Sequence, residues 1–423
     1  MDLTDQRPAA GPDTVVVVGG GLIGLCCAVQ LLVAGEPVQL LDPGGDPPPP
    51  TWGNAGHIAT ECIEPLASWK TLREAPRQLY SAGGSLAFRP ADLPAWLPFA
   101  ARYLRACTAA SYANGVAALD YLMADAMPAW KRLAALLGEP DLVRDHGHWV
   151  VYESARRCAA AGRGVGPIGS GHARCLPLDP GLLEALRTRV RPALAGGYAY
   201  EGTGQVRRPA DVLDALRRRV RELGGSFRRG RAVRLAPGRG QHRLLLDDGT
   251  ALEPRRLLIA AGAWSTGLME DAGHHAPLIA ERGYHIEAEA GDWADFPSVV
   301  FEDRSVVVTR FGERLRATSF VEFSRAESAP DAGKWQRLKA HVAALGVPLH
   351  GPITTWSGPR PTLPDYLPAI GASRRLSGLY YAFGHQHLGL TLAARTGELV
   401  AAVLRDPAGT ARLAAFDIER FAS

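Results

Sequence analysis

The chain has 423 residues, of which 47% are hydrophobic and 21% charged, enough for one large globular unit or two interleaved ones. Its formal net charge of +4 is small for this length, so the composition gives no indication of a nucleic-acid partner. The six cysteines form no C-x-x-C pair, and we expect a reduced, cytoplasmic protein without structural disulfides or a cysteine-based zinc site. Two arginine-rich runs, 217–219 and 228–231, are expected to be a solvated helix face and a strand edge.

The uncharged stretch 14–35 has the length of a signal sequence or membrane span. The preceding residues 1–13 are acidic rather than basic, and three consecutive glycines interrupt the stretch. We therefore expect no membrane span here, and a flexible N-terminal segment over 1–13.

The same stretch has the pattern of a dinucleotide-binding unit. Four β-branched residues at 15–18 predict a buried strand, and G-x-G-x-x-G at 19–24 leads into a helical pattern. A second strand over 38–41 ends in Asp42, whose carboxylate can accept hydrogen bonds from ribose hydroxyls.

Each glycine of this motif has a physical role. Gly19 permits the tight turn, Gly21 lets a pyrophosphate approach the backbone, and Gly24 allows close helix–strand packing. The helix start at Leu22 and Ile23 offers free N–H groups and the positive end of the helix dipole to the phosphates.

The continuation of the chain favours FAD over NAD. A proline-rich and glycine-rich loop follows Asp42, and long helical segments are predicted over roughly 92–111 and 115–138. A simple NAD domain would instead continue with alternating helices and strands.

Five motifs occur in an order that resembles one known family. They are GNAGHI (53–58), IAAGAWS (259–265), ERGYH (281–285), WSGPRPTLPDYLPAIG (356–371) and GHQHLGLT (384–391). Over residues 14 to 405 the chain resembles the D-amino-acid oxidase-like family of FAD-dependent amine oxidoreductases. It is most similar to the bacterial D-amino-acid dehydrogenases, especially the D-hydroxyproline dehydrogenase type.

The resemblance implies an α/β fold in which a Rossmann-type FAD-binding domain is interleaved with an α+β substrate domain built on an antiparallel sheet. We expect the FAD-binding domain to comprise 14–90, 205–270 and 350–415, and the substrate domain 91–204 and 271–349. FAD is expected to be bound non-covalently. Beyond the first motif, the residues expected to contact it are Gly53, Asn54, Ala55, Gly56, His57, Val233, Gly262, Gly358, Gly384, His385, Leu388, Gly389, Leu390 and Thr391.

Arg360 is the main candidate for substrate binding. It lies between two prolines, and the arginine at this position of the family holds the substrate carboxylate. A planar, permanently charged fork is suited to that task. A surface salt bridge is the alternative.

Four further residues could lie near the substrate or the flavin. Tyr284 matches a strand position that faces the substrate in relatives, with a buried core tyrosine as the alternative. His285 would then point to the opposite face, and Arg282 is a reserve candidate for the carboxylate. His57 is expected beside the flavin rather than as a proton carrier.

His385 and His387 could be a pair of metal ligands, but no third ligand stands at zinc-like spacing. The segment runs directly into a helix, whose N-terminus can stabilise negative charge on a reduced flavin. We therefore expect a flavin loop and no metal, with His387 contributing to substrate choice.

These patterns predict oxidation of a D-amino acid by hydride transfer from Cα to FAD. A cyclic secondary amine such as D-hydroxyproline or D-proline is preferred, and the electrons pass to a quinone or another carrier. A glycine- or sarcosine-type oxidase that uses dioxygen, and a flavoprotein subunit of a larger electron-transfer complex, stay open as alternatives. A peripheral position of the protein at the inner face of the membrane also stays open.

Overall fold

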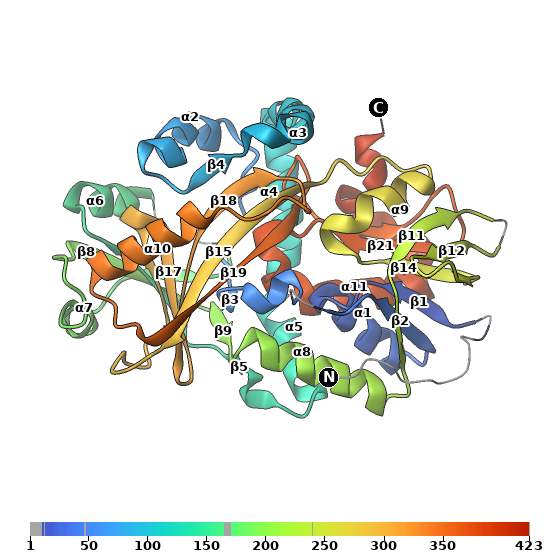
Figure 1. Ribbon diagram of the computed structural model, residues 1–423, viewed down its shortest axis with the longest axis horizontal. Coiled ribbons are helices and arrows are strands. Elements are labelled where there is room, and N and C mark those ends of the chain that lie inside the picture. Colours follow the sequence, from blue (N-terminus) through green and yellow to red (C-terminus); the bar gives the residue numbers. More distant parts are fainter. Residues whose placement is uncertain (1–10, 12, 46–47, 165–170, 239, 423) are drawn as a thin grey trace.

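The computed structural model describes residues 11, 13–45, 48–164, 171–238 and 240–422 (Figure 1). The expected flexible segment 1–13 lies outside the described residues, apart from Gly11 and Asp13. Among the described residues, no helix is both long and apolar enough to cross a membrane.

A six-stranded sheet forms one half of the molecule. Its strand order is β10-β2-β1-β14-β21-β20, and all neighbours are parallel except β20 and β21. The strands are β1 (Val15–Val18), β2 (Val38–Asp42), β10 (Ser226–Arg229), β14 (Arg256–Ile259), β20 (Ala369–Ala372) and β21 (Leu379–Phe383). The four valines of β1 are buried on both faces, as a central parallel strand requires.

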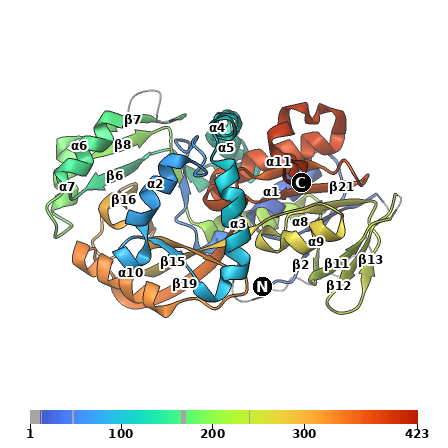
Figure 2. The ribbon, with the colours of Figure 1, turned by 90° about the horizontal axis from the view of Figure 1, so that it is seen from above.

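Helices cover one face of this sheet, and a small sheet with one helix lies on the other (Figures 1 and 2). The first face carries α1 (Leu22–Val33), α5 (Ala126–Leu136), α8 (Pro209–Glu222) and α11 (Gly389–Arg405). The second carries β11 (Ala232–Ala236), β12 (Arg243–Leu246), β13 (Ala251–Leu252) and α9 (Ser265–Asp271).

A nine-stranded, largely antiparallel sheet forms the other half. Its main path is β19-β15-β18-β17-β16-β6-β8-β7, and β4 pairs with β18. The strands are β4 (Leu86–Phe88), β6 (His148–Tyr152), β7 (Arg174–Pro177), β8 (Gly196–Glu201), β15 (Ile279–Glu289), β16 (Ser298–Phe301), β17 (Val306–Phe311), β18 (Arg314–Ser324) and β19 (His350–Thr362). A small sheet of β3 (His57–Ile58), β9 (Gly204–Val206) and β5 (Val143–Arg144) lies between the halves.

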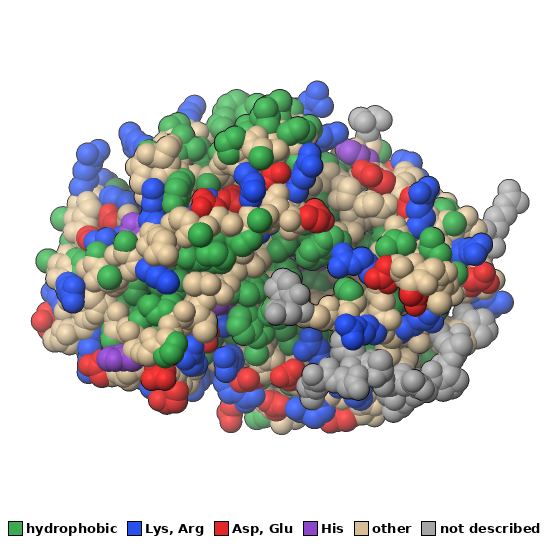
Figure 3. Space-filling model, in the orientation of Figure 1, with side chains coloured by type: hydrophobic (Ala, Val, Ile, Leu, Met, Phe, Trp, Pro, Cys, Tyr) green, Lys and Arg blue, Asp and Glu red, His purple; other side chains and the backbone are tan. Residues whose placement is uncertain are grey.

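In the part of the chain that the structure describes, five further helices lie around the large sheet (Figure 2): α2 (Trp69–Gln78), α3 (Leu93–Ala106), α6 (Ala155–Gly164), α7 (Pro180–Arg187) and α10 (Ala332–Leu345). Helix α4 (Ala109–Met123) instead packs with α5 and α11 in the core of the parallel-sheet half. On the face shown in Figure 3, basic and acidic side chains are intermixed.

The predicted fold class is confirmed: a parallel sheet of Rossmann type is interleaved with a largely antiparallel one. The prediction of two long helices over 92–111 and 115–138 is wrong, because three helices occupy this region. Thr108 accepts a hydrogen bond from the Ser111 N–H and thereby starts a new helix where continuation was expected. The sheet pairing also differs from the expected boundary at residue 350. β19 pairs with β15 in the large sheet, and the chain rejoins the parallel sheet only at β20.

Candidate active site

A cavity of about 1100 Å³ lies at the carboxyl ends of the parallel strands and extends to the large sheet. Gly19, Asp42, Ala260 and Phe383, which follow or end four of the parallel strands, line it on one side. Arg360 of β19 lines it on the other. A cleft at this edge of an open parallel sheet is the usual ligand site of such folds, and this volume exceeds that of most drug-sized pockets.

The glycines of the first motif leave room for a ligand at one point only. Gly19 has φ +113°, and a Cβ there would stand 2.4 Å from the carbonyl oxygen of Ala260. A Cβ on Gly24 would collide with the Gly19 carbonyl at 1.9 Å, so helix α1 packs directly on the turn. A Cβ on Gly21 would meet no protein atom within 4 Å, because this backbone faces the cavity. The space beside Gly21 and the N-terminus of α1 fits a pyrophosphate.

Asp42 is held at the end of β2 by backbone donors. Its Oδ2 accepts a hydrogen bond from the Gly20 N–H (2.7 Å), and its Oδ1 accepts one from the Gly44 N–H (2.8 Å). Each carboxylate oxygen has a further lone pair, so the residue can still accept ribose hydroxyls where the sequence placed it.

The loop that contains Gly53 to Gly56 is anchored to the large sheet by two residues that the sequence did not single out for this role. Arg316 of β18 donates to the carbonyl oxygens of Trp52 (2.8 Å) and Asn54 (2.7 Å). His285 Nδ1 donates to the Gly53 carbonyl (3.0 Å). The alternation of side chains along β15 and β18 was visible in the sequence. The segments that each face of these strands contacts were not.

The segment 384–391 forms the third wall. Gly384 has φ +80°, where a Cβ would also collide with Leu363. Helix α11 begins at Gly389, and the Thr391 hydroxyl oxygen accepts a hydrogen bond from the Ala59 N–H (2.9 Å). The free N–H groups of this helix start therefore lie at the cavity, next to the loop after β3.

The two histidines of this segment have different surroundings. His385 is 2% exposed, and its Nε2 lies 3.0 Å from the Thr396 hydroxyl on α11. His387 is exposed where it lines the cavity. Burial lowers the pKa of His385 to about 3. Desolvation inside the cavity, followed by the charge of Arg360, lowers the pKa of His387 to about 4. The grouping of potential metal ligands found in the described residues does not include this pair.

Arg360 lies in the cavity above a glycine. A Cβ on Gly283 would stand 2.3 Å from the Arg360 Nη2, so only a hydrogen atom at this position of β15 leaves the guanidinium in place. Nη1 donates a long hydrogen bond to the Phe320 carbonyl (3.4 Å). Burial lowers the pKa of Arg360, while Glu281 and Tyr366 oppose the shift. No ion pair within 4 Å joins Arg360 to another described residue, which leaves the guanidinium available to an anion.

The structure corrects the expected faces of β15. Tyr284 is among the cavity-lining residues, but its ring packs edge-on against Phe320 and Trp335 on the far side of the sheet. Its hydroxyl donates to Glu322 Oε1 (3.1 Å) and accepts from the Asp331 N–H (3.0 Å). This arrangement agrees with the alternative of a core tyrosine.

Arg282 lies on that far side as well, where its Nη2 donates to the Arg325 carbonyl (3.3 Å). His285, which was expected to point away from the flavin, lies on the cavity side, and its ring stacks on Trp356. The side of a strand that faces a neighbouring unit depends on the packing of that unit, which strand alternation alone does not reveal.

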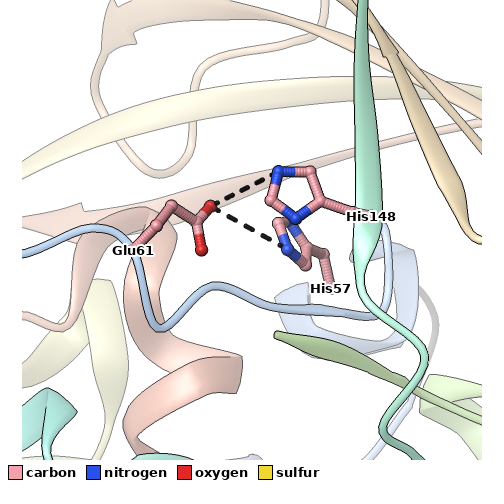
Figure 4. A group of neighbouring side chains, drawn as sticks. All are labelled: His57, Glu61 and His148. Atoms are coloured by element: carbon pink, nitrogen blue, oxygen red, sulfur yellow. Dashed lines mark ion pairs between the residues drawn. The ribbon is translucent and has the colours of Figure 1, made fainter. Parts of the chain in front are cut away.

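His57 lines the cavity beside two residues that sequence spacing could not connect, Glu61 and His148 (Figure 4). Burial, and secondarily His146, lower the pKa of His57 to about 4. Burial raises the pKa of Glu61 to about 7.

The cavity wall contains most of the residues predicted to hold the cofactor. It includes Gly19, Gly21, Leu22, Ile23, Asp42, Gly53, Asn54, Ala55, His57, Gly262, Gly358, His385, Gly389 and Leu390. It does not include Gly24, Gly56, Val233, Gly384, Leu388 and Thr391. Val233 is 48% exposed on β11, whereas its neighbours Arg231 and Ala232 line the cavity.

The arginine-rich runs also reach the cavity. Arg217, Arg221, Arg229 and Arg231 line its wall while remaining partly or fully exposed, so the expected solvated helix face and edge strand also border the cavity. Their positive charge complements a pyrophosphate.

The match to a protein family decides which dinucleotide this site holds. Residues 14–403 match the family described as FAD dependent oxidoreductase (DAO). The chain belongs to this family. FAD is therefore the cofactor of this FAD-dependent oxidoreductase, and the open backbone at Gly21, the carboxylate of Asp42 and the free helix N-termini fit it. The predicted family and cofactor are confirmed.

Two curated relatives cover nearly the whole oxidoreductase. The chain is 30% identical over 417 residues to a D-amino-acid oxidase of Bradyrhizobium diazoefficiens, which spans 96% of this chain and 98% of the relative. It is 27% identical over 433 residues to a D-amino acid dehydrogenase of Cereibacter sphaeroides, with coverage of 97% and 95%.

Two solved structures share the fold of this oxidoreductase. An L-proline dehydrogenase from P. horikoshii matches with a TM-score of 0.72 at 15% identity, covering 98% of this chain and 99% of that one. A glycine oxidase from Geobacillus kaustophilus matches with a TM-score of 0.70 at 22% identity, covering 96% and 98%. At these identities the likeness shows the fold alone.

Proposed function

We propose that this FAD-dependent oxidoreductase dehydrogenates a D-amino acid, preferably a cyclic secondary amine such as D-hydroxyproline or D-proline. The CH–NH bond of the substrate loses two electrons and two protons and becomes C=N, and the electrons pass on to a quinone or another carrier. Relatives named D-amino-acid oxidase and D-amino acid dehydrogenase support the amino-acid class. The motif resemblance to the D-hydroxyproline dehydrogenase type supports the cyclic substrate.

The observation that carries the proposal is the position of Arg360. Its guanidinium lines the cavity above Gly283 and has no ion-pair partner within 4 Å among the described residues. A desolvated guanidinium without a partner is suited to bind a carboxylate through two parallel hydrogen bonds. Binding the carboxylate fixes one end of an amino acid and so orients its Cα–H and amine.

His387 lies in the same cavity and is neutral at physiological pH, since its pKa is lowered to about 4. A neutral ring nitrogen can accept a hydrogen bond from the substrate amine without adding positive charge beside Arg360. FAD, when bound, supplies the hydride acceptor. Arg316 and His285 keep the loop 52–54 in place, so they act on the reaction through that loop.

We also propose that FAD is bound without a covalent link. The segment 357–365, which matches the region where several relatives carry an attaching cysteine, contains none. Cys62 lines the cavity, but burial and the neighbouring Glu61 raise its thiol pKa well above the usual value. A thiol held in its protonated form is a poor nucleophile. Denaturation should therefore release all the flavin.

The test is a panel of D- and L-amino acids with an artificial dye as electron acceptor. D-proline and D-hydroxyproline should give the highest kcat/KM. Arg360→Ala should lower kcat/KM tens- to thousands-fold, because losing one partner of a desolvated charge pair costs about 2–5 kcal/mol. Arg360→Lys should recover little of the loss, and Arg105→Ala on the exposed side of α3 should match the wild type. Wild-type kinetics in Arg360→Ala would refute the proposed carboxylate site.

An oxidase is the second candidate, since the relative that is 30% identical is named D-amino-acid oxidase. Stoichiometric hydrogen peroxide without added dye would favour dioxygen as the acceptor. No turnover of the isolated chain with dye and any amino acid would favour the alternative of a subunit that acts within a larger complex.

A further inference from the structure

Three side chains from separate parts of the chain meet beside the cavity (Figure 4). His57 belongs to β3, Glu61 to the loop that follows, and His148 is the first residue of β6. His57 Nε2 lies 3.9 Å from Glu61 Oε1, and His148 Nε2 lies 3.8 Å from the same oxygen. One potential ligand atom of each residue lies within 4.8 Å of the other two. Neither nitrogen–oxygen separation is a hydrogen bond.

The tautomer of His148 follows from its neighbours. The Thr203 hydroxyl donates its one hydrogen to the Tyr200 carbonyl (3.0 Å), so its oxygen must accept from His148 Nδ1 (2.9 Å). With the proton on Nδ1, the Nε2 of the neutral ring carries a lone pair, and this lone pair faces Glu61. A hydrogen bond that fixes the far nitrogen is what orients many metal-binding histidines.

The side chains of His57 and Glu61 also contain atoms that no described hydrogen-bond donor reaches. His57 Nε2 and Glu61 Oε2 are buried without a hydrogen-bond partner among the described residues. Glu61 Oε1 receives only a weak bond from the Cys62 thiol, at 3.7 Å, and within the same part of the chain no lysine or arginine pairs with this carboxylate. Two imidazole nitrogens and a carboxylate thus converge with no cationic side chain of the described residues between them. Buried polar groups normally have partners, and two without one beside the lone pair of His148 indicate a ligand.

We propose that His57, Glu61 and His148 bind one divalent transition-metal ion, for which zinc is the probe. Two imidazoles and one carboxylate suit zinc and its neighbours in the first transition row, whereas magnesium and calcium prefer oxygen ligands alone. Zinc–ligand bonds of about 2.0–2.2 Å place tetrahedral ligands roughly 3.3–3.5 Å apart, so each nitrogen must approach the Glu61 oxygen by only about 0.5 Å.

The position of the ion determines what it can do. His57 and Glu61 line the cavity, so a fourth coordination position would open toward the space that holds substrate and cofactor. Three protein ligands with one open position are typical of catalytic rather than structural zinc. The ion would also join the loop after β3 to the first residue of β6 in the large sheet. This proposal revises the expectation of no metal, and it does not depend on the proposed amino-acid oxidation.

The test measures metal binding to the holoprotein, independent of turnover. After treatment with a chelator, the protein is dialysed to equilibrium against micromolar zinc, and elemental analysis gives the zinc content per chain. Wild type should bind one zinc ion, as should the control His350→Ala, which removes an exposed histidine of β19. Glu61→Gln and His148→Ala should fall to background zinc. Magnesium should not bind.

The flavin absorption spectrum and far-ultraviolet circular dichroism show whether each variant is folded. Thr203→Val is a milder variant that keeps all three ligands and removes only the oxygen that orients His148. It should weaken zinc binding about 10–100-fold. Zinc should raise the unfolding temperature of the wild type and not of Glu61→Gln. No zinc bound to the wild type, equal binding by His148→Ala, or unchanged affinity in Thr203→Val would each overturn the proposal.

Discussion

Arg316 and Glu287 form a buried ion pair across β18 and β15, with Nη2 and Oε2 2.6 Å apart and side-chain exposures of 1% and 4%. Burial disfavours both charges, but Arg316 lowers the pKa of Glu287 below its usual value. The same guanidinium donates to the carbonyls of Trp52 and Asn54. The pair therefore links the large sheet to the loop that lines the cofactor cavity.

Arg316→Met should lower the free energy of unfolding by about 3–5 kcal/mol, because Glu287 would remain as a buried charge without its main partner. FAD should also bind more weakly, since the loop 52–54 loses its anchor. Urea denaturation and FAD titration measure the two effects. Arg314→Met is the matched control: Arg314 contacts the same carboxylate but is 28% exposed, so its loss should cost less than about 1 kcal/mol. Equal losses in the two variants would contradict the anchoring role.

Gly283→Ala should impair substrate binding without releasing FAD. The new Cβ would lie 2.3 Å from the Arg360 Nη2, so the guanidinium must move away from its position in the cavity. We expect kcat/KM to fall at least tenfold, which corresponds to about 1.4 kcal/mol, mainly through KM. Gly267→Ala on α9 is the control, since a Cβ there meets nothing within 4 Å. A normal KM in Gly283→Ala would show that the position of Arg360 does not matter.

Gly21→Leu should yield a folded protein without flavin. The backbone conformation of Gly21 (φ −73°) is open to any residue, and no protein atom obstructs its Cβ, so the only expected clash is with the pyrophosphate. Flavin absorbance per chain after purification measures the loss. Gly267→Leu, at an exposed position, should keep full flavin content. Full flavin content in Gly21→Leu would disprove the pyrophosphate position.

Local patterns in the sequence predicted the parts of the site that depend on local structure. The strand 15–18, the glycine turn and Asp42 lie in one short βαβ segment, whose geometry follows from glycine conformation and hydrophobic periodicity. The predicted cavity position of Arg360 came from a family motif rather than from periodicity.

Where the position of a side chain depends on tertiary packing, the sequence provided no prediction or assigned the side chain to the wrong face of its strand. The directions in which the side chains of β15 point depend on what packs against each face of the strand. One face contacts Arg316 and Gly53, and the other contacts Glu322 and α10. The cluster of His57, Glu61 and His148 combines residues from two different sheets and a loop, and no sequence spacing connects His148 to the other two. The arginines near 217–231 look like surface charge in the sequence, because their helix and strand give no sign that they adjoin a cavity.

His385 should make the protein acid-sensitive. Its folded pKa of about 3 lies below the usual 6.5, so the unfolded chain takes up a proton that the folded chain does not. The stability contributed by the neutral ring is present above pH 6.5 and is lost as the pH falls toward 3. At pH 4.5 the loss is roughly 3 kcal/mol. His385→Gln should reduce the fall in unfolding free energy between pH 7 and 4.5 by that amount, and His350→Gln should not. An unchanged pH dependence in His385→Gln would contradict the buried neutral ring.

His387→Ala should change the ranking among D-amino acids while FAD stays bound, because His387 is exposed in the cavity rather than packed into α11. Since the pKa of His387 is lowered to about 4, the ring is already neutral above pH 5. A requirement for deprotonation that appears in kcat/KM near or above neutral pH must then belong to another group, such as the substrate amine. This limb of the pH–rate profile should keep its apparent pKa in His387→Ala. Loss of flavin, an unchanged substrate ranking or a shifted neutral limb would each show that His387 has a different role.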